Sequence, residues 1–171
     1  MKFAEDKKNR PVLDIPRSQL EQTIEIVTIA ALLSGIIYAA AYWSDLPDRI
    51  PVHFGIDGTP DGWGSKLLML LPLGVSVVIY VGLTILSRYP HIYNYPWTIT
   101  SDNAPKMYAL ARLFMSTLKC EIVVLFSYIT YATIATALGA ASGLGLVSVP
   151  LIMAFVFGTI AWYFWSSYKA R

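Results

Sequence analysis

The sequence predicts an all-α integral membrane protein, built as a bundle of four transmembrane helices. Hydrophobic residues make up 56% of the chain and charged residues 14%, and the mean hydropathy is +0.53. This is more apolar surface than a soluble domain of this size can bury. Four apolar stretches, at 24–42, 67–86, 121–138 and 144–165, are each long enough to cross a hydrocarbon core, which needs about 20 residues. They lack the period-two alternation of a barrel strand, so each is expected to be helical.

The first apolar stretch follows a polar leader at residues 1–23. Small residues at its end, Ala39–Ala41, resemble a signal-peptide cleavage site. Because a polar leader precedes the apolar run, we expect this stretch to be a retained membrane anchor.

The basic residues predict the orientation of the spans. Apart from Arg49 and Lys66, they lie in the leader, in the segment leading into the third span, or in the tail at 166–171. They are Lys2, Lys7, Lys8, Arg10, Arg17, Arg88, Lys106, Arg112, Lys119, Lys169 and Arg171. By the positive-inside rule, both termini are expected in the cytoplasm. The protein itself is expected in the plasma (inner) membrane. The net charge of +2 fits this topology and gives no reason to expect a nucleic-acid partner.

The loop at 43–66, between the first two spans, is expected to lie outside the cell and to be ordered. It holds many of the chain's prolines, glycines and aspartates, which fix turns and permit positive φ. On the cytoplasmic side, residues 87–120 should form a connection that ends in an extension of the third helix. Asp102 or Asn103 can cap that extension, with Pro105 in its first turn. A glycine-rich turn at 139–145 leads to the fourth span.

Small residues recur at about four-residue spacing on the first and fourth spans. The positions are Ala31, Gly35 and Ala39 on the first span and Ala154, Gly158 and Ala161 on the fourth. Such ridges let helices approach closely, so these faces are expected to pack against a neighbouring helix or a second protomer. The lone Cys120 cannot form an intramolecular disulfide and is interpreted as a small buried hydrophobic residue.

Three side chains of the outer loop form a candidate metal site. His53, Asp57 and Asp61 offer one imidazole and two carboxylates at four-residue spacings. Nitrogen and oxygen ligands of this kind suit zinc or a harder divalent ion. In the alternative interpretation, the aspartates form turns and His53 bonds a backbone carbonyl. Trp63 is then an interfacial anchor, and Lys66 is a basic residue at the start of a helix.

Charged residues near the membrane boundary form a second candidate site. Glu25 lies at the inner edge of the first span, and Lys119 and Glu121 lie at the comparable edge of the third. Ionisable groups in a membrane usually find a partner, so Glu25 is expected to pair with Lys119 or Arg112. The alternative places these charges at the level of the lipid headgroups.

The outer loop resembles that of SdpI-like bacterial membrane proteins, which share a domain of unknown function. The residues that carry the resemblance are Leu46, Pro47, Ile50, Pro51, His53, Phe54, Gly58, Asp61, Gly62, Trp63, Gly64, Ser65 and Lys66, and Asn94–Pro96 is also similar. The family is named for an immunity protein that protects a cell from a secreted peptide toxin and holds a transcriptional repressor at the membrane. Its immunity proteins carry further membrane helices after this domain, so the resemblance implies the fold and the loop more directly than immunity.

These observations predict a non-enzymatic binding or sensing protein, related to toxin-peptide immunity or signal transduction. The outer loop would capture a peptide toxin or a lipid-like ligand through His53, Phe54, Asp57, Asp61, Trp63 and Lys66. Besides membrane lipids, a second copy of the chain or another membrane protein is an expected partner. One alternative is a metal-assisted hydrolase, in which His53, Asp57 and Asp61 hold a metal-bound water. Another is a small transporter or a subunit of a larger complex, suggested by Pro72 and Pro150 within two spans.

Overall fold

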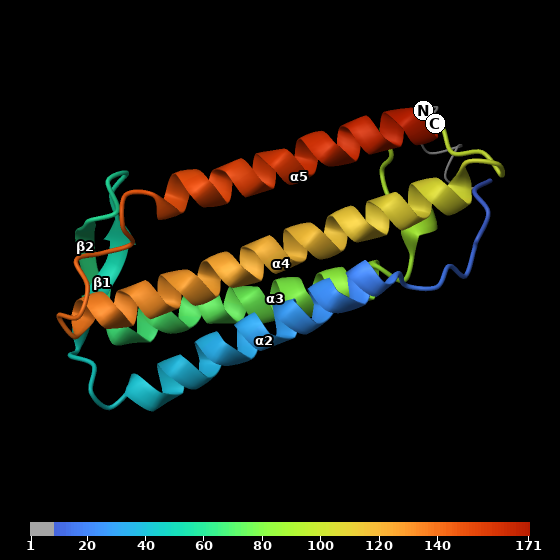
Figure 1. Cartoon of the computed structure of the whole chain (residues 1–171). Helices are drawn as coiled ribbons and strands as arrows, with labels where there is room; N and C mark the ends of the chain where they lie inside the picture. The colour runs from blue at the N-terminus through green and yellow to red at the C-terminus, as the bar shows by residue number, and fades with distance from the viewer. Residues whose placement is uncertain (1–8) are drawn as a thin grey trace.

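The computed structural model describes residues 9–171 and is mostly helical (Figure 1). Its long helices are Gln19–Tyr42 (α2), Leu70–Leu86 (α3), Ala104–Ala137 (α4) and Ser148–Ala170 (α5). Three helical segments are long and apolar enough to cross a membrane: α2, α3 together with the 3₁₀ turn before it (Lys66–Leu86), and α5. The basic segment at 1–8 that was used to predict orientation lies outside the described residues.

The expectation of an all-α chain is wrong in the segment between α2 and α3, which contains a small antiparallel sheet. Strand β1 (Arg49–Phe54) pairs with strand β2 (Pro60–Ser65), so that Arg49 lies opposite Ser65 and Phe54 opposite Pro60. Proline and glycine argue against a strand in the middle of a sheet. They are tolerated here because each strand of a two-stranded sheet has one unpaired edge. The chain reverses through residues 55–59, where Gly58 has a φ of +79°.

Helix α4 is the central element of the bundle. At 34 residues it is about 51 Å long, and it contacts α2, α3, α5 and β1. It begins at Ala104, so the expected third span at 121–138 lies in its second half. Asn103 occupies the N-cap position, but the expected side-chain cap is not formed, because its Oδ1 accepts from the Thr100 N–H instead (2.9 Å). Length and composition alone do not place α4 among the membrane-crossing helices. Three of its charged side chains, Arg112, Lys119 and Glu121, instead meet partners on the neighbouring helices.

Helix α2 begins at Gln19, five residues before the expected start of the first span. Ser18 and Glu21 form a capping box, in which Ser18 Oγ accepts from the Glu21 N–H (3.2 Å) and Glu21 Oε2 accepts from the Ser18 N–H (2.7 Å). Such a box satisfies two backbone donors at the helix start. The polar side chains before Ile24 therefore belong to the helix.

Helices α2 and α4 pack closely at the predicted ridge of small residues. Ser127 Oγ on α4 donates to the carbonyl of Ala31 (2.9 Å), and a Cβ at Gly35 would lie 3.0 Å from the same Ser127 Oγ. Glycine at 35 thus allows the contact. The ridge on α5 differs, because a Cβ at Gly158 would meet no atom within 4 Å.

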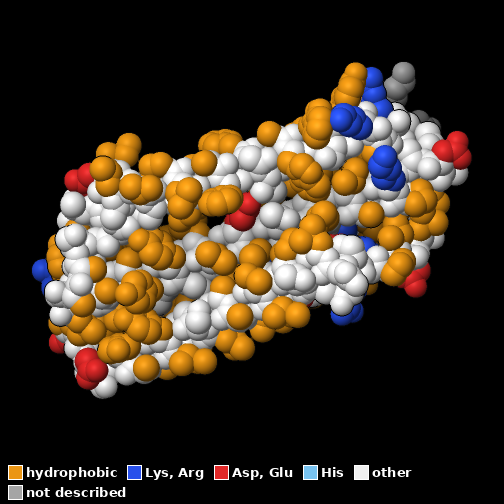
Figure 2. All heavy atoms as spheres, viewed as in Figure 1, with side chains coloured by type: hydrophobic (Ala, Val, Ile, Leu, Met, Phe, Trp, Pro, Cys, Tyr) orange, Lys and Arg blue, Asp and Glu red, His pale blue; other side chains and the backbone are white. Residues whose placement is uncertain are grey.

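Buried apolar clusters close the bundle at both ends. The first cluster, next to the hairpin, consists of Ala39, Leu46, Ile50, Met69, Leu73 and Ile134. The second, at the far end, consists of Tyr95, Ile99, Ala104, Met107, Tyr108, Ala111, Tyr163 and Ala170. Between the ends, apolar side chains cover much of the face shown in Figure 2. Val78 and Phe157 are among the exposed apolar residues of the helices. An apolar belt of this kind matches a lipid environment better than water.

Candidate functional site

The hairpin of β1 and β2 is fixed to the helices at its base and at its tip. At the base, Ile50 is fully buried, and Leu46 is buried in the same cluster. At the tip, the Leu144 N–H from the turn between α4 and α5 donates to the Gly58 carbonyl (2.8 Å). A Cβ at Gly58 would lie 2.8 Å from the Gly145 carbonyl oxygen, so only glycine allows this close approach without a shift. The hairpin is therefore an ordered part of the fold.

Two of the predicted loop residues face each other across the hairpin. His53 Nδ1 on β1 lies 2.5 Å from Asp61 Oδ1 on β2. The pair is open to solvent, with 72% of the His53 side chain and 53% of the Asp61 side chain exposed. Gly62 is opposite His53, and a Cβ at Gly62 would lie 2.9 Å from His53 Cβ. Glycine at 62 thus leaves the imidazole room beside the neighbouring strand.

Asp57, the third predicted metal ligand, forms a local turn. Its Oδ1 accepts from the Thr59 backbone N–H (3.0 Å) and from the Thr59 hydroxyl (2.8 Å). These two donors stabilise the charged carboxylate and lower the pKa of Asp57. Within residues 9–171, the structure holds no group of three His, Cys, Asp or Glu side chains placed to bind a metal ion. The structure brings His53 and Asp61 together, whereas one Asp57 oxygen binds Thr59. A divalent ion in this loop stays a prediction.

The remaining predicted loop residues are Phe54 and Trp63 on the strands and Lys66 directly after β2. Trp63 is 49% exposed, while its carbonyl accepts from the Arg49 guanidinium (3.3 Å). Ile56 at the hairpin turn is 96% exposed, and Phe54 is half-buried. Lys66 donates to the Leu46 carbonyl (3.4 Å) and so connects the 3₁₀ turn after β2 to the loop between α2 and β1. The hairpin thus presents exposed apolar side chains close to a polar pair.

Charged and polar side chains connect α2, α3 and α4 inside the bundle. Lys119 Nζ on α4 lies 2.7 Å from Glu25 Oε2 on α2 and 2.9 Å from Thr84 Oγ1 on α3. The Tyr80 hydroxyl on α3 donates to Glu25 Oε1 (2.7 Å). The sequence suggested Lys119 or Arg112 as the partner of Glu25, and the structure brings Lys119 to it. Three helices are thereby joined by one polar cluster.

Arg112 pairs with Glu21, a residue that the sequence analysis did not single out. Its Nε donates to Glu21 Oε1 (2.6 Å), and its guanidinium also reaches Glu21 Oε2 (3.2 Å). Two further donors bind the carbonyls of Ile15 (2.7 Å) and Pro16 (2.9 Å). The Ser-x-x-Glu spacing at 18–21 is a capping-box pattern and was the available signal for Glu21. No local sequence pattern indicates its salt bridge to Arg112, because the two residues are 91 positions apart.

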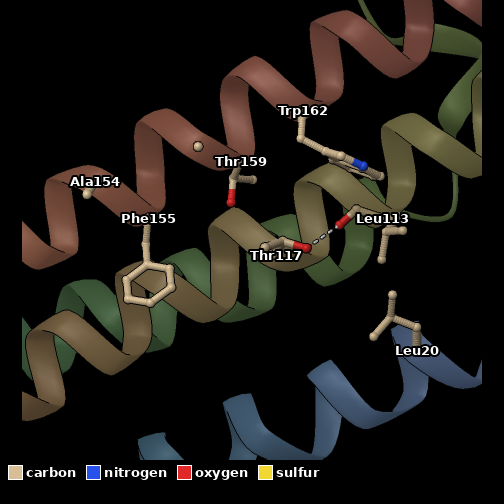
Figure 3. Close-up of a pocket in the computed structure, with 8 residues that line it drawn as sticks. Leu20, Leu113, Thr117, Ala154, Phe155, Thr159 and Trp162 are labelled. Carbon is tan, nitrogen blue, oxygen red and sulfur yellow. Dashed lines mark hydrogen bonds between the residues drawn. The ribbon is translucent and has the colours of Figure 1, made fainter.

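A hollow of about 340 Å³ lies between α4 and α5 near the start of α2 (Figure 3). Phe155 and Trp162 of α5 line it opposite Leu113 and Thr117 of α4. Next to it, the Thr159 hydroxyl donates to Glu121 Oε1 (2.6 Å). Glu121 Oε2 is buried and has no hydrogen-bond partner within the described chain. Cys120, its neighbour on α4, is half-buried and carries a free thiol.

Comparisons with known proteins match the segment that contains the hairpin. A family model for a domain of unknown function (DUF1648) matches residues 30–75, from within α2 through the hairpin into α3. An uncharacterized protein of Archaeoglobus fulgidus is 29% identical over 94 residues, covering 50% of this chain and 49% of that protein. The chain therefore spans about half the length of this curated relative. No solved structure matches.

Proposed function

We propose that this protein is a non-enzymatic, multi-pass plasma-membrane protein that captures an amphipathic peptide or lipid-like molecule at the outer face of the cell. The capture would serve immunity to a membrane-active toxin or the sensing of one. The hairpin is the proposed capture surface, and the helices are its membrane anchor.

The proposed topology includes α4 as a fourth crossing. Its charged side chains Arg112 and Lys119 are buried and paired with Glu21 and Glu25, so they are shielded from lipid. Polar groups in membrane bundles usually face the interior in this way. The hairpin lies at one end of the bundle and the connection between α3 and α4 at the other (Figure 1). With the basic residues inside, the hairpin faces outward.

The observation that carries the binding proposal is the combination of rigidity and exposure in the hairpin. Gly58 at the tip is buried against the turn between α4 and α5, and Ile50 at the base is buried in a cluster with helical residues, whereas Trp63 and Ile56 remain exposed. A preformed surface loses little conformational entropy when a ligand binds. The His53–Asp61 pair adds hydrogen-bonding groups close to the apolar side chains, which suits an amphipathic ligand.

The link to immunity is supported by the resemblance of the outer loop to SdpI-like proteins and by the family match at 30–75, which spans the same loop. Both features concern the hairpin and its flanking helices. The class of ligand proposed here is therefore a membrane-active peptide.

Survival of cells exposed to such peptides tests the proposal. Cells that express the protein should survive at least one member of a panel of secreted amphipathic peptides better than cells with Trp63→Ala or His53→Ala. Trp165→Ala is the matched control, because Trp165 is also exposed but lies near the end of α5. Surface expression of each variant is measured in parallel. Equal survival of wild type and hairpin variants across the panel, at equal expression, would contradict the proposal.

A further inference from the structure

A polar cavity lies at the end of the bundle away from the hairpin. Its volume is about 310 Å³, and it is bordered by residues 13–17, by Ser87, Arg88 and Pro90 after α3, and by Arg112 of α4. Three arginine side chains therefore border one cavity. None of these residues belongs to the proposed capture surface.

Two of these arginines have guanidinium groups that form no hydrogen bond within the described residues. Arg17 and Arg88 are exposed, and neither side chain forms a hydrogen bond or salt bridge within the part of the chain that the structure describes. Arg17 also interacts electrostatically with the Glu25 carboxylate, without a direct bond to it. Guanidinium groups bind phosphate oxygens through paired, charge-assisted hydrogen bonds. Two exposed cations whose guanidinium groups form no hydrogen bond within the described residues therefore border the cavity from opposite segments.

Arg112 contributes to the cavity in a different way. Its donors are already used by the Glu21 carboxylate and by the carbonyls of Ile15 and Pro16. These bonds fix the backbone of the segment that precedes α2, and with it the position of Arg17. Arg112 is therefore a positioning residue, and Arg17 and Arg88 are the ligand-binding groups.

Asp14 is the carboxylate that borders the same cavity. It is exposed and opposes the binding of an anion, so the cavity retains a net positive charge only because of the arginines. Removal of the Asp14 charge should therefore strengthen the binding of an anion, whereas removal of an arginine charge should weaken it.

The position of the cavity identifies the source of the anion. Arg17 lies two residues before the start of α2, and Arg88 lies two residues after the end of α3. Both helices are apolar segments of membrane length, so their ends lie at the level of the lipid headgroups. Basic pockets between helices at this level suit anionic headgroups. We propose that this cavity binds the phosphate headgroup of an anionic phospholipid through Arg17 and Arg88.

Lipid titration of the purified full-length protein in detergent tests the proposal. Phosphatidylglycerol should bind, as resolved by native mass spectrometry, and phosphatidylcholine should bind more weakly. Arg17→Gln/Arg88→Gln should raise the Kd for phosphatidylglycerol by about tenfold or more, because each lost guanidinium removes a charge-assisted contact. Asp14→Asn should lower the Kd. Lys106→Gln/Lys169→Gln is the matched control, since both lysines are exposed and lie outside the cavity.

The outcomes separate a lipid from free phosphate. Preference for phosphatidylglycerol that is lost in the arginine double variant and kept in the lysine control supports the proposal. Equal affinity for the two lipids, or an equal loss in both double variants, would overturn it. Stabilisation of the lipid-free protein by millimolar inorganic phosphate, without any preference between lipids, would overturn the lipid source in favour of a soluble phosphate ligand.

Discussion

Glu25 and Lys119 show how single residues hold the helices together. Their side chains are 16% and 3% exposed, so neither charge is well solvated by water. Glu25→Gln leaves the buried Lys119 ammonium without a counter-ion, although its bond to the Thr84 hydroxyl remains. We expect the unfolding free energy to fall by about 2–4 kcal/mol. Thermal unfolding in detergent, followed by near-ultraviolet circular dichroism, should therefore show a lower midpoint.

The control for this prediction is the double variant Glu25→Gln/Lys119→Met. It removes both charges together, so no buried ion is left unpaired, and most of the lost stability should return. If Glu25→Gln alone leaves the midpoint unchanged, the ion pair contributes nothing to stability.

Asp57 makes the hairpin turn sensitive to acid. Thr59 donates two hydrogen bonds to its carboxylate, and these hold the pKa of Asp57 below the ordinary value of 3.8. Because the folded pKa is lowered, the contribution to stability is present above pH 3.8 and is lost as the pH falls through the folded pKa. Carbon-13 NMR titration of the Asp57 carboxyl group should give a midpoint below 3.8.

Thr59→Val tests the cause of this shift. The variant removes the hydroxyl donor and keeps the backbone N–H, so the midpoint should move part of the way back toward 3.8. A wild-type midpoint at or above 3.8 would contradict the hydrogen-bonded turn.

At the scale of elements, the docking of the hairpin tip depends on one glycine. Gly58 has a φ of +79°, and a Cβ there would clash with the Gly145 carbonyl. Gly58→Ala should therefore detach the tip from the turn between α4 and α5, in addition to a backbone cost of about 1–2 kcal/mol. Hydrogen exchange of the Leu144 amide, which donates to the Gly58 carbonyl, should become faster.

Gly139→Ala is the matched control for the tip. Gly139 also has a positive φ, +75°, but a Cβ there would meet no atom within 4 Å. This variant should show the backbone cost without faster exchange at Leu144. The same exchange rate in both variants would show that contact with Gly145 does not hold the tip.

Hydropathy could predict the helices, but it could not predict contacts between residues that are far apart in the sequence. The apolar runs place α2, α3 and α5 to within a few residues, because a membrane-length helix is a local property of composition. The strands were missed because Pro51, Gly62 and Gly64 are unfavourable in a central strand, and only the two-stranded context admits them. The Arg112–Glu21 pair depends on the arrangement of whole helices, which no single stretch of sequence encodes.

At the scale of the whole molecule, α4 explains how a chain with this composition can form a bundle. It is the helix that contacts all three apolar helices, and it carries basic side chains that meet Glu21 and Glu25 of α2. Its polar character follows from this central position, since groups inside the bundle need hydrogen-bonding partners that lipid cannot supply. The two ends of the bundle differ: the hairpin lies at one end (Figure 1). The arginine-lined cavity borders the segments that precede α2 and follow α3, at the other end.

The difference between the two ends of the bundle predicts which end faces the outside of the cell. Cys120 is the one cysteine, so Cys120→Ser gives a background for single-cysteine labelling. Ile56→Cys, at the exposed hairpin turn, should react with a membrane-impermeant maleimide in intact cells. Ser101→Cys, in the connection before α4, should react only after permeabilisation, because the proposed crossing by α3 separates the two positions. Labelling of both positions in intact cells would exclude the proposed crossing by α3. Labelling of Ser101→Cys without labelling of Ile56→Cys would exclude the outward orientation of the hairpin.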